Sequence, residues 1–516
     1  MAIADRPNDP MNLAASNDID RSNDRTGAAA LADKYDTIAY AARSHAVSHP
    51  DHLATLATLF GLTPPPVANC RVLEFGCNDG ANLLPIAAAL PAGEFVGCDV
   101  SARAVDAARR AVAELGLTNV TLLQQDLREL PAELGAFDYM IAHGIYSWVP
   151  APVRDALLRL ASQRLAPNGV LFVSYNVYPG CHVRQAAWEM LHFHVDSIAD
   201  PRARLDAARA LSNILAEPGP TQNEIDAMLR NELKRLAQQS DSALFHDDLA
   251  EPNEPLYFHE FVAHAERHGL KFLAEAKLSM MASAGLSPRV QQLLAGLDRL
   301  KREQYLDFAR MRRFRQSLLC RGESATGFTL ARERIATMHA SATTPLLRAA
   351  VDGKTFGAEG SGDTATARAM LQWLVEIAPR AAAVDEIKAW LANRAAGGSN
   401  MASGSVEALL ADACFAGAVQ LHVHPPALAI AASERPIANL IVRWQAARQE
   451  HVTNLRHETM TLKDPTARTL LAMLDGSRTR AQLAGTVNVG ESDAFAAEHR
   501  VDEYVRQFAK HGLLIG

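Results

Sequence analysis

The stretch VLEFGCNDGANLLPIA, residues 72–87, joins a short apolar run, a glycine-punctuated turn and a helix-like run. This order is typical of the first strand, loop and helix of a doubly wound α/β domain, in which the loop contacts a nucleotide-like ligand. A dinucleotide-binding turn requires Gly-x-Gly-x-x-Gly, but Asn78 stands at its second glycine and Ala81 at its third. A Walker loop is excluded because the turn does not end in Gly-Lys-Ser/Thr. The loop therefore indicates a ligand without a diphosphate group.

The sequence around this loop alternates between short apolar runs and longer helical patterns. Runs rich in Val, Ile and Phe predict strands at 70–76, 94–100, 120–126, 137–144 and 170–176, and 314–320 alternates like a further strand. Helical patterns occupy 82–90, 102–117 and 151–165. This alternation predicts βαβ units, and therefore an α/β fold with a mainly parallel sheet.

The residues of the loop fit a different cofactor. Glu74, followed by the glycine-rich turn 76–80, resembles the first motif of the class I S-adenosylmethionine-dependent methyltransferases, acid-x-Gly-x-Gly-x-Gly. Asn78 replaces the middle glycine, a tolerable change for a cofactor that carries no pyrophosphate. The sequence therefore indicates S-adenosylmethionine.

Further polar residues follow the next strands in the order that this cofactor needs. Asp99 ends the second predicted strand, where a carboxylate can accept both ribose hydroxyls. Asp126 ends the third, where it and the backbone of Leu127 can bind the adenine, and His143 ends the fourth, facing the methyl group. Each acid alone is equally well explained as a loop residue or helix cap, but the ordered set favours a cofactor site.

The methyl acceptor should bind at the same edge, because ligands of open α/β sheets lie at the carboxyl ends of the strands. HGIYSWVP and SYNVYPGCH follow the fourth and fifth predicted strands, and FHDDLAEPNEPLYFHEF (245–261) is a further polar and aromatic segment. The catalytic candidates are His143, Tyr146, Tyr175 and Asn176. The substrate-binding candidates are Trp148, Tyr178, His246, Asp247 and Tyr257. Packing of the aromatic side chains and helix capping by the acids are the alternative explanations.

Length and composition limit the class of protein. A chain of 516 residues is expected to hold two to four domains, and 48% apolar with 21% charged residues fits a globular protein. The net charge of −7 argues against a nucleic-acid partner. Six cysteines without a Cys-x-x-Cys pair indicate a cytoplasmic protein with reduced thiols. We expect no membrane span, and the polar N-terminus lacks the layout of a secretory signal.

The sequence divides into regions that differ in composition and in predicted secondary structure. Residues 1–28 are expected to form a disordered tail, and 29–325 the α/β domain with a helical insertion at 184–245. An Ala-rich helical middle domain is predicted at 326–430 and a winged-helix-like module at 431–516. No metal site is expected, because the pairs LHFH and LHVHPP lack a third ligand nearby. The basic run RMRRFRQ, 310–316, is interpreted as a solvated or subunit-facing surface.

Several longer sequence segments resemble those of a known protein family. YDTIAY, SHPDHLATLATLFG, EFGCNDGANLLP, AHGIYSWVP, SYNVYPG, HDDLAEPNEPLYFHEFVAHAERHGL and RRFRQSLLC resemble bacterial methyltransferases that carry a methyltransferase regulatory domain. Among these, the chain is most similar to the rickettsial-type protein-lysine methyltransferases. The resemblance covers most of residues 30–325, and the tail resembles the C-terminal module of that group. It implies a Rossmann-like seven-stranded sheet and a regulatory-type segment at 215–300.

The resemblance also implies site residues and an assembly. The implied cofactor-binding residues are Glu74, Gly76, Cys77, Gly80, Asn82, Asp99, Asp126 and Leu127, with Tyr35 and Tyr40 in a segment that covers the cofactor. A homodimer with the helical insertion as its interface is implied in the same way.

Three hypotheses follow for the function. The first is a protein N-methyltransferase acting on lysine, because large additional domains suit a macromolecular acceptor. The second is a small-molecule O- or N-methyltransferase, and the third is an inactive cofactor-binding interaction protein, against which the intact Glu74, Asp99 and Asp126 argue. An open groove beside Tyr146 and Tyr175 would favour the first, and a closed apolar pocket the second.

Overall fold

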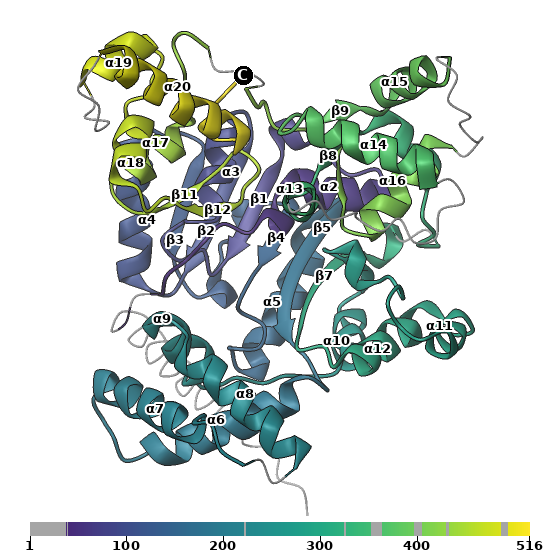
Figure 1. Ribbon diagram of the computed structural model, residues 1–516. Coiled ribbons are helices and arrows are strands. Elements are labelled where there is room, and N and C mark those ends of the chain that lie inside the picture. Colours follow the sequence, from purple (N-terminus) through teal and green to yellow (C-terminus); the bar gives the residue numbers. More distant parts are fainter. Residues whose placement is uncertain are drawn as a thin grey trace, which may run out of the picture.

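The computed structural model describes most of the chain (Figure 1). The described residues are 38, 40–220, 223–324, 327–351, 364–396, 405–429, 433–486 and 494–516. The tail predicted at 1–28 and the candidate Tyr35 lie outside them. No described helix is long and apolar enough to cross a membrane.

A mixed sheet forms the centre of the molecule (Figure 1). In the described residues it has seven strands in the order β3-β2-β1-β4-β5-β7-β6, with β7 antiparallel to both of its neighbours. The strands are β1 (Arg71–Phe75), β2 (Glu94–Asp99), β3 (Val120–Gln124), β4 (Phe137–Ala142), β5 (Leu165–Asn176), β6 (Leu270–Glu275) and β7 (Phe314–Arg321). The predicted seven-stranded Rossmann-like class is confirmed.

Helices cover this sheet because its strands are apolar on both faces. Phe75, Phe95, Tyr139 and Phe172 are all at most 1% exposed, which is typical of parallel strands between helical layers. The covering helices include α2 (Pro50–Leu59), α3 (Leu83–Ala89), α4 (Ala102–Leu115), α5 (Ala151–Arg164) and α10 (Phe258–Arg267). Short 3₁₀ turns lie at Ala46–Ser48, Val67–Asn69, Leu127–Glu129, Ala132–Leu134, Leu278–Met280, Gly322–Ser324 and Arg332–Thr337.

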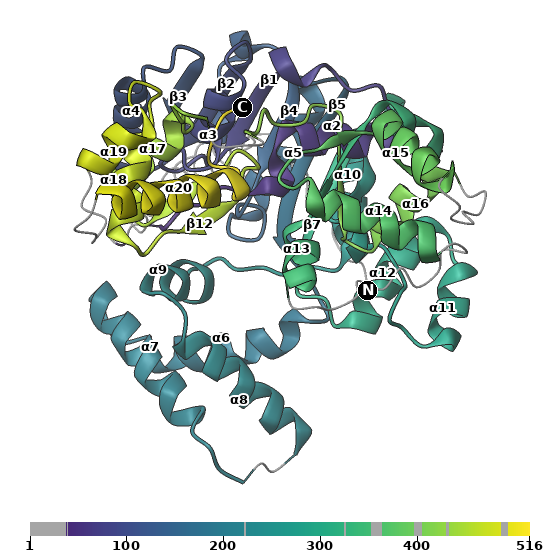
Figure 2. The same cartoon turned by 45° about the horizontal axis from the view of Figure 1, so that its top comes forward.

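The predicted insertion is helical and begins three residues earlier than expected. It contains α6 (Cys181–Val195), α7 (Pro201–Leu215), α8 (Glu224–Ala237) and the short α9 (Asp241–Ala243), followed by a π-type turn at Leu244–Asp248. These helices bury their own apolar cluster, which includes Leu191, Leu205 and Leu233. Figures 1 and 2 show α6, α7 and α8 projecting away from the sheet. The insertion is therefore a packing unit of its own.

The middle region is less purely helical than predicted. It has α13 (Thr344–Val351), α14 (Thr364–Glu376), α15 (Val384–Ala396), α16 (Val406–Phe415), and a small sheet of β8 (His339–Ala342), β9 (Ala382–Ala383) and β10 (Val419–His422). Its apolar residues join the core of the central sheet in one continuous cluster. His422 Nδ1 also lies 2.7 Å from Asp51 Oδ2 of α2. This region therefore packs as part of the α/β body.

The C-terminal module has its own core and packs against α3 and α4. It comprises α17 (Leu440–Ala446), β11 (His451–Thr453), β12 (Thr459–Thr461), α18 (Pro465–Ala472), α19 (Arg480–Thr486) and α20 (Ala494–Lys510). Ile441 of α17 packs with Leu84 and Leu115 of α3 and α4. Trp444 Nε1 donates to Glu114 of α4 at 2.7 Å.

A buried ion cluster links β6, β7 and α12 (Arg299–Arg310), beside the smaller α11 (Pro288–Ala295). Arg315, 1% exposed, binds Glu275 at 2.6 Å, Asp307 at 2.9 Å and Glu303 at 3.2 Å. Its guanidinium also lies 4.0 Å from the centre of the Phe258 ring. The interpretation of 310–316 as a solvated surface is therefore wrong for this arginine, because paired carboxylates compensate its charge inside the core.

Candidate functional site

A cavity of about 540 Å³ lies at the carboxyl ends of the parallel strands. Residues at or just beyond the carboxyl ends of β1, β2, β3, β4 and β5 all line it, as expected for an open α/β sheet. Its volume falls in the usual range of small-molecule sites, roughly 300–1,000 Å³. The cavity brings together the predicted cofactor residues Glu74, Gly76, Cys77, Asn82, Asp99, Asp126 and Leu127 with Tyr40.

The glycine-rich turn is shaped by three residues with positive φ. Gly76 has φ +63°, Asn78 +48° and Gly80 +79°. A Cβ on Gly76 would lie 2.7 Å from Ile145 Cδ1, and one on Gly80 would lie 2.7 Å from Leu84 Cγ. Asn78 replaces the middle glycine because Asn adopts the left-handed conformation more readily than other non-glycine residues. The backbone requirement of the motif is therefore preserved.

Glu74 is the most unusual group in the cavity. Its side chain accepts from Asn82 Nδ2 at 2.7 Å through Oε1, whereas Oε2 is buried with no hydrogen-bond partner in the described structure. Burial raises the pKa of Glu74 to about 8. Asn82 Oδ1 in turn accepts from the backbone of His45 at 2.9 Å and from His457 at 2.8 Å. An unpartnered buried carboxylate oxygen fits the ammonium group of S-adenosylmethionine.

Asp99 and Asp126 lie where the ribose and adenine are expected. Asp99 accepts from the backbone of Asn78 and of Ser101, both at 2.9 Å, and this holds its carboxylate at the end of β2. Asp126 caps the turn that follows β3 and pairs with Arg128 at 2.8 Å. Leu127, 8% exposed, completes this wall. Carboxylates at these strand ends can accept ribose hydroxyls and the adenine amino group.

The segment before α2 contributes residues that the sequence did not single out. Arg43 and His45 line the cavity together with Tyr40. The His45 ring lies 3.7 Å, centre to centre, from that of His143. Burial lowers the pKa of His143 to about 3, and its Nδ1 has no partner in the described structure. His143 is therefore a neutral hydrogen-bonding group near pH 7 and a very weak base.

Tyr146 and Tyr175, predicted to face the methyl group, do not line this cavity. Tyr175 stacks on Phe261 at 4.0 Å, and its hydroxyl meets Ser317 Oγ at 2.9 Å. The Tyr146 hydroxyl lies 2.7 Å from Nδ1 of His264. Successive side chains of a strand point to opposite faces, so Tyr175 points away from the cavity that its neighbour Asn176 lines. This placement differs from the sequence expectation.

The other acceptor candidates divide between the cavity and its surroundings. Asn176, Trp148, His246 and Asp247 line it. Asn176 Nδ2 donates to Asn253 at 2.9 Å, and Trp148 Nε1 is buried without a partner among the described residues. Tyr178 and Tyr257 do not line it. Tyr178 stacks on His182, and Tyr257 caps α10.

The acceptor end of the cavity has further residues that the sequence reasoning missed. Arg184 of α6 and Arg313, Phe314 and Gln316 near the start of β7 line it. They come from the insertion and from an antiparallel strand, so a search along the ends of parallel strands could not find them. A sequence signal for these residues was the segment RRFRQ, 312–316, which is part of the longer segment that resembles the methyltransferase family.

Comparisons with known proteins agree with this fold. Residues 72–169 match the family model "Methyltransferase domain", 240–321 match "Predicted methyltransferase regulatory domain", and 434–513 match "PKMT, C-terminal winged helix domain". The predicted winged-helix class of the C-terminal module is therefore confirmed. The fold matches PKMT2 from Rickettsia typhi with a TM-score of 0.78 at 23% identity, covering 92% of this chain and all of that one. PKMT2 has also been solved in complex with AdoHcy.

Two relatives from Rickettsia prowazekii (strain Madrid E) are more similar in sequence. Uncharacterized protein RP789 is 38% identical over 300 residues, 58% of this chain and 54% of RP789, so the chain spans about half the length of that relative. Uncharacterized protein RP028 is 32% identical over 240 residues, 46% of this chain and 96% of RP028.

Fold, cavity and family matches together define a class I S-adenosylmethionine-dependent methyltransferase, with S-adenosylmethionine as its cofactor. Within this class, the chain belongs to the rickettsial-type methyltransferases that carry a methyltransferase regulatory domain and a PKMT-type winged-helix domain.

Proposed function

We propose that the protein transfers a methyl group from S-adenosylmethionine to the side-chain amine of a lysine in a protein substrate. The main structural support for this proposal is the position of Asp247. Asp247 lines the cavity, and Asp248, Arg184 and Arg235 are the charged groups that act on its carboxylate. Trp148 and Phe314 line the same cavity. A carboxylate beside aromatic walls is the environment that binds an ammonium group.

The reaction requires the amine to lose its proton before it attacks. A lysine amine has a pKa of about 10.4, so deprotonation near pH 7.4 costs roughly 4 kcal/mol. Burial and the neighbouring Asp248 raise the pKa of Asp247 to about 6. The carboxylate is therefore mostly ionised at pH 7, yet basic enough to receive a proton. Bound S-adenosylmethionine supplies an activated methyl carbon, and the protein mainly orients the amine for in-line displacement.

Neighbouring side chains can hold the amine in line. The side-chain oxygen of Asn176 can accept a hydrogen bond from the amine, because the amide nitrogen is held by Asn253. The neutral His143 can orient the amine or the cofactor without charge repulsion. We assign orientation to both residues and proton acceptance to Asp247.

The similar proteins support a macromolecular acceptor. PKMT abbreviates protein-lysine methyltransferase, and both a matching family model and a structural neighbour carry that name. The helical insertion and the C-terminal module also extend well beyond what a cofactor pocket needs. The small-molecule methyltransferase and the inactive binding protein remain the alternatives that an experiment must separate.

The test is transfer of labelled methyl from S-adenosylmethionine into host lysate that is then separated into protein and small-molecule fractions. Amino-acid analysis of the protein fraction identifies the methylated residue, and Asp99→Ala is the inactive control. Label in methyl-lysine that is lost in the control supports the proposal. Label only in small molecules supports the metabolite alternative, and no label above the control supports the inactive binding protein.

We also propose that the protein forms a homodimer through the insertion. The support is that Phe193, Ile214 and Ile225 of α6, α7 and α8 are 89%, 60% and 76% exposed, so each helix of the insertion carries an exposed large apolar side chain that a partner could cover. Light scattering should give twice the chain mass for the wild type and the chain mass for Phe193→Glu. Phe495→Glu, at a 79% exposed position on α20, is the matched control. A monomeric wild-type protein would refute this assembly.

A further inference from the structure

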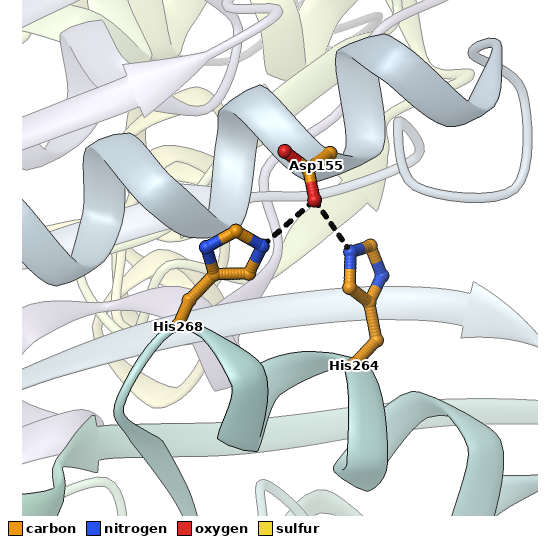
Figure 3. Close-up of side chains that lie close together, drawn as sticks. All are labelled: Asp155, His264 and His268. Atoms are coloured by element: carbon orange, nitrogen blue, oxygen red, sulfur yellow. Dashed lines mark hydrogen bonds and ion pairs between the residues drawn. The ribbon is translucent and has the colours of Figure 1, made fainter.

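Three side chains from two helices meet outside the cofactor cavity (Figure 3). His264 lies on α10, His268 caps the C-terminal end of that helix, and Asp155 lies on α5. His268 Nε2 is 2.9 Å from Asp155 Oδ1, and His264 Nε2 is 3.4 Å from the same oxygen. The three possible ligand atoms lie within 4.8 Å of one another, and within the described chain they form the one such group of three.

The spacing suits a transition-metal ion. Histidines four residues apart lie on one helix face, so their rings can converge on one ion. Tetrahedral Zn²⁺ with bonds of about 2.0–2.2 Å places its ligand atoms about 3.4 Å apart. His264 and Asp155 already have that separation, and His268 has to withdraw from Asp155 by only ~0.5 Å. The Asp155 side chain is 52% exposed and therefore has room to move.

A buried hydroxyl fixes the orientation of one ligand. Tyr146, 1% exposed, places its hydroxyl 2.7 Å from Nδ1 of His264. With a proton on Nδ1, His264 donates to this hydroxyl and keeps the lone pair of Nε2 for an ion. Histidine ligands of metals normally donate their other ring N–H to a partner of this kind.

The surroundings allow a cation to enter and to keep a water ligand. Asp155 and His264 line a second cavity, of about 880 Å³, which leaves a fourth coordination position accessible. The C-terminal end of α10 favours positive charge. Four arginines line the same cavity: Arg154 pairs with Glu254, Arg128 pairs with Asp126, and Arg159 and Arg267 add further positive charge. The carboxylate of Asp155 supplies the remaining negative charge.

We propose that His264, His268 and Asp155 form a binding site for a divalent transition-metal ion of the Zn²⁺ type. The site has three protein ligands and one open position. The ion ties α10, within the segment that matches the regulatory-domain model, to α5 of the methyltransferase domain. Through His264 it also fixes Tyr146, whose neighbour Ile145 lines the cofactor cavity.

The test is direct metal binding to the untagged, metal-free, full-length protein. Co²⁺ is titrated while its visible absorption is recorded, and Zn²⁺ is titrated by calorimetry. We expect one ion per chain and a Zn²⁺-dependent rise in melting temperature. His264→Ala, His268→Ala and Asp155→Ala should each weaken binding by on the order of 100-fold or more, and Tyr146→Phe by about 10-fold.

His194→Ala on α6 is the matched control, because that histidine is exposed and lies in the pair LHFH; its binding should equal that of the wild type. A wild-type protein that gives no Co²⁺ absorption band and no Zn²⁺ heat at 100-fold molar excess would overturn the proposal. Unchanged affinity in all three ligand variants would overturn it too. Because separate variants report on each ligand and on Tyr146, the site can still be tested if one variant fails to fold.

Discussion

His457 of the winged-helix module donates through Nε2 to Oδ1 of Asn82, 2.8 Å away, although 375 residues separate them in sequence. Asn82 Nδ2 binds Glu74 at 2.7 Å. Burial keeps the pKa of His457 well below its usual value, so the ring is neutral and donates one N–H. The C-terminal module thus holds a residue of the cofactor cavity in place.

The first prediction concerns this contact. His457→Asn should weaken S-adenosylmethionine binding by about 5- to 10-fold, because a hydrogen bond of about 1 kcal/mol that orders Asn82 is lost. Asn is chosen because position 457 has φ +59°, a conformation that Asn tolerates. Calorimetric titration with the cofactor measures the change, and His499→Ala on the exposed face of α20 is the control. Equal affinities for variant and wild type would contradict it.

The second prediction is a pH dependence of cofactor binding. Because burial raises the pKa of Glu74 to about 8, its carboxyl is mostly neutral below pH 8 in the free protein. The cationic cofactor binds the ionised form, so affinity should fall by up to ~10-fold per pH unit from pH 8 towards 6. In the free protein, the raised pKa means that protonated Glu74 favours the folded state. This contribution to the free energy of unfolding is lost as pH rises from the ordinary pKa of a glutamate towards 8. Glu74→Gln should remove the slope, and a variant that retains it would refute the assignment.

The third prediction separates steric from conformational roles of glycine. Gly76→Ala should abolish detectable cofactor binding and destabilise the fold by about 2–4 kcal/mol, because φ is +63° and the new Cβ meets Ile145. Gly116→Ala has a similar φ, +65°, but nothing within 4 Å of the new Cβ. It should cost only about 1–2 kcal/mol and leave binding intact. Denaturant unfolding and cofactor titration measure both; equal losses would contradict the steric explanation.

The fourth prediction tests the acceptor role of Asp247. Asp247→Asn should lower kcat/KM for the protein substrate by about 100-fold while cofactor affinity stays within a factor of two. In the wild type, kcat/KM should rise with pH through about 6, because the ionised carboxylate binds and deprotonates the amine. Asp196→Asn, at the exposed position that follows α6, is the control. Loss of cofactor binding in Asp247→Asn would show instead that this carboxylate belongs to the cofactor site.

The fifth prediction concerns the buried ion cluster. Arg315→Met should lower the free energy of unfolding by about 3–5 kcal/mol, because Glu275 and Glu303 lose their buried counter-charge and Asp307 keeps only Arg312, 3.1 Å away. Lys301→Met on α12 is the control, since its side chain is 71% exposed. Chemical denaturation measures both variants. A change below 1 kcal/mol for Arg315→Met would show that the carboxyl groups are neutral in the fold.

The strand-end residues that line the cavity were predictable from sequence, whereas only some of the acceptor candidates line it. Glu74, Asp99 and Asp126 follow directly from strand ends, because parallel strands bring their carboxyl ends to one edge. Tyr175 shows the limit of this reasoning, since a strand end fixes the position of a residue but the pleat decides which face its side chain takes.

Contacts between distant segments were beyond sequence reasoning altogether. Asp155 is 109 residues from His264, so no local spacing reveals that they meet. His457 reaches Asn82 only because the C-terminal module packs on α3 and α4. The basic run around Arg315 suggested a solvent-exposed surface. Inside the core, however, Glu275, Glu303 and Asp307, which lie on other elements, compensate the charge of Arg315.

The single apolar cluster that runs from Leu53 of α2 to Leu421 of β10 has an evolutionary consequence. A chain cut after residue 321, where the regulatory-domain match ends, would expose the face of α2 that the middle region covers. The middle region could therefore not be exchanged between relatives as an independent cassette. Substitutions on α2 and on β10 must be inherited together, so this pair should retain a common ancestry even where the outlying insertion has been replaced.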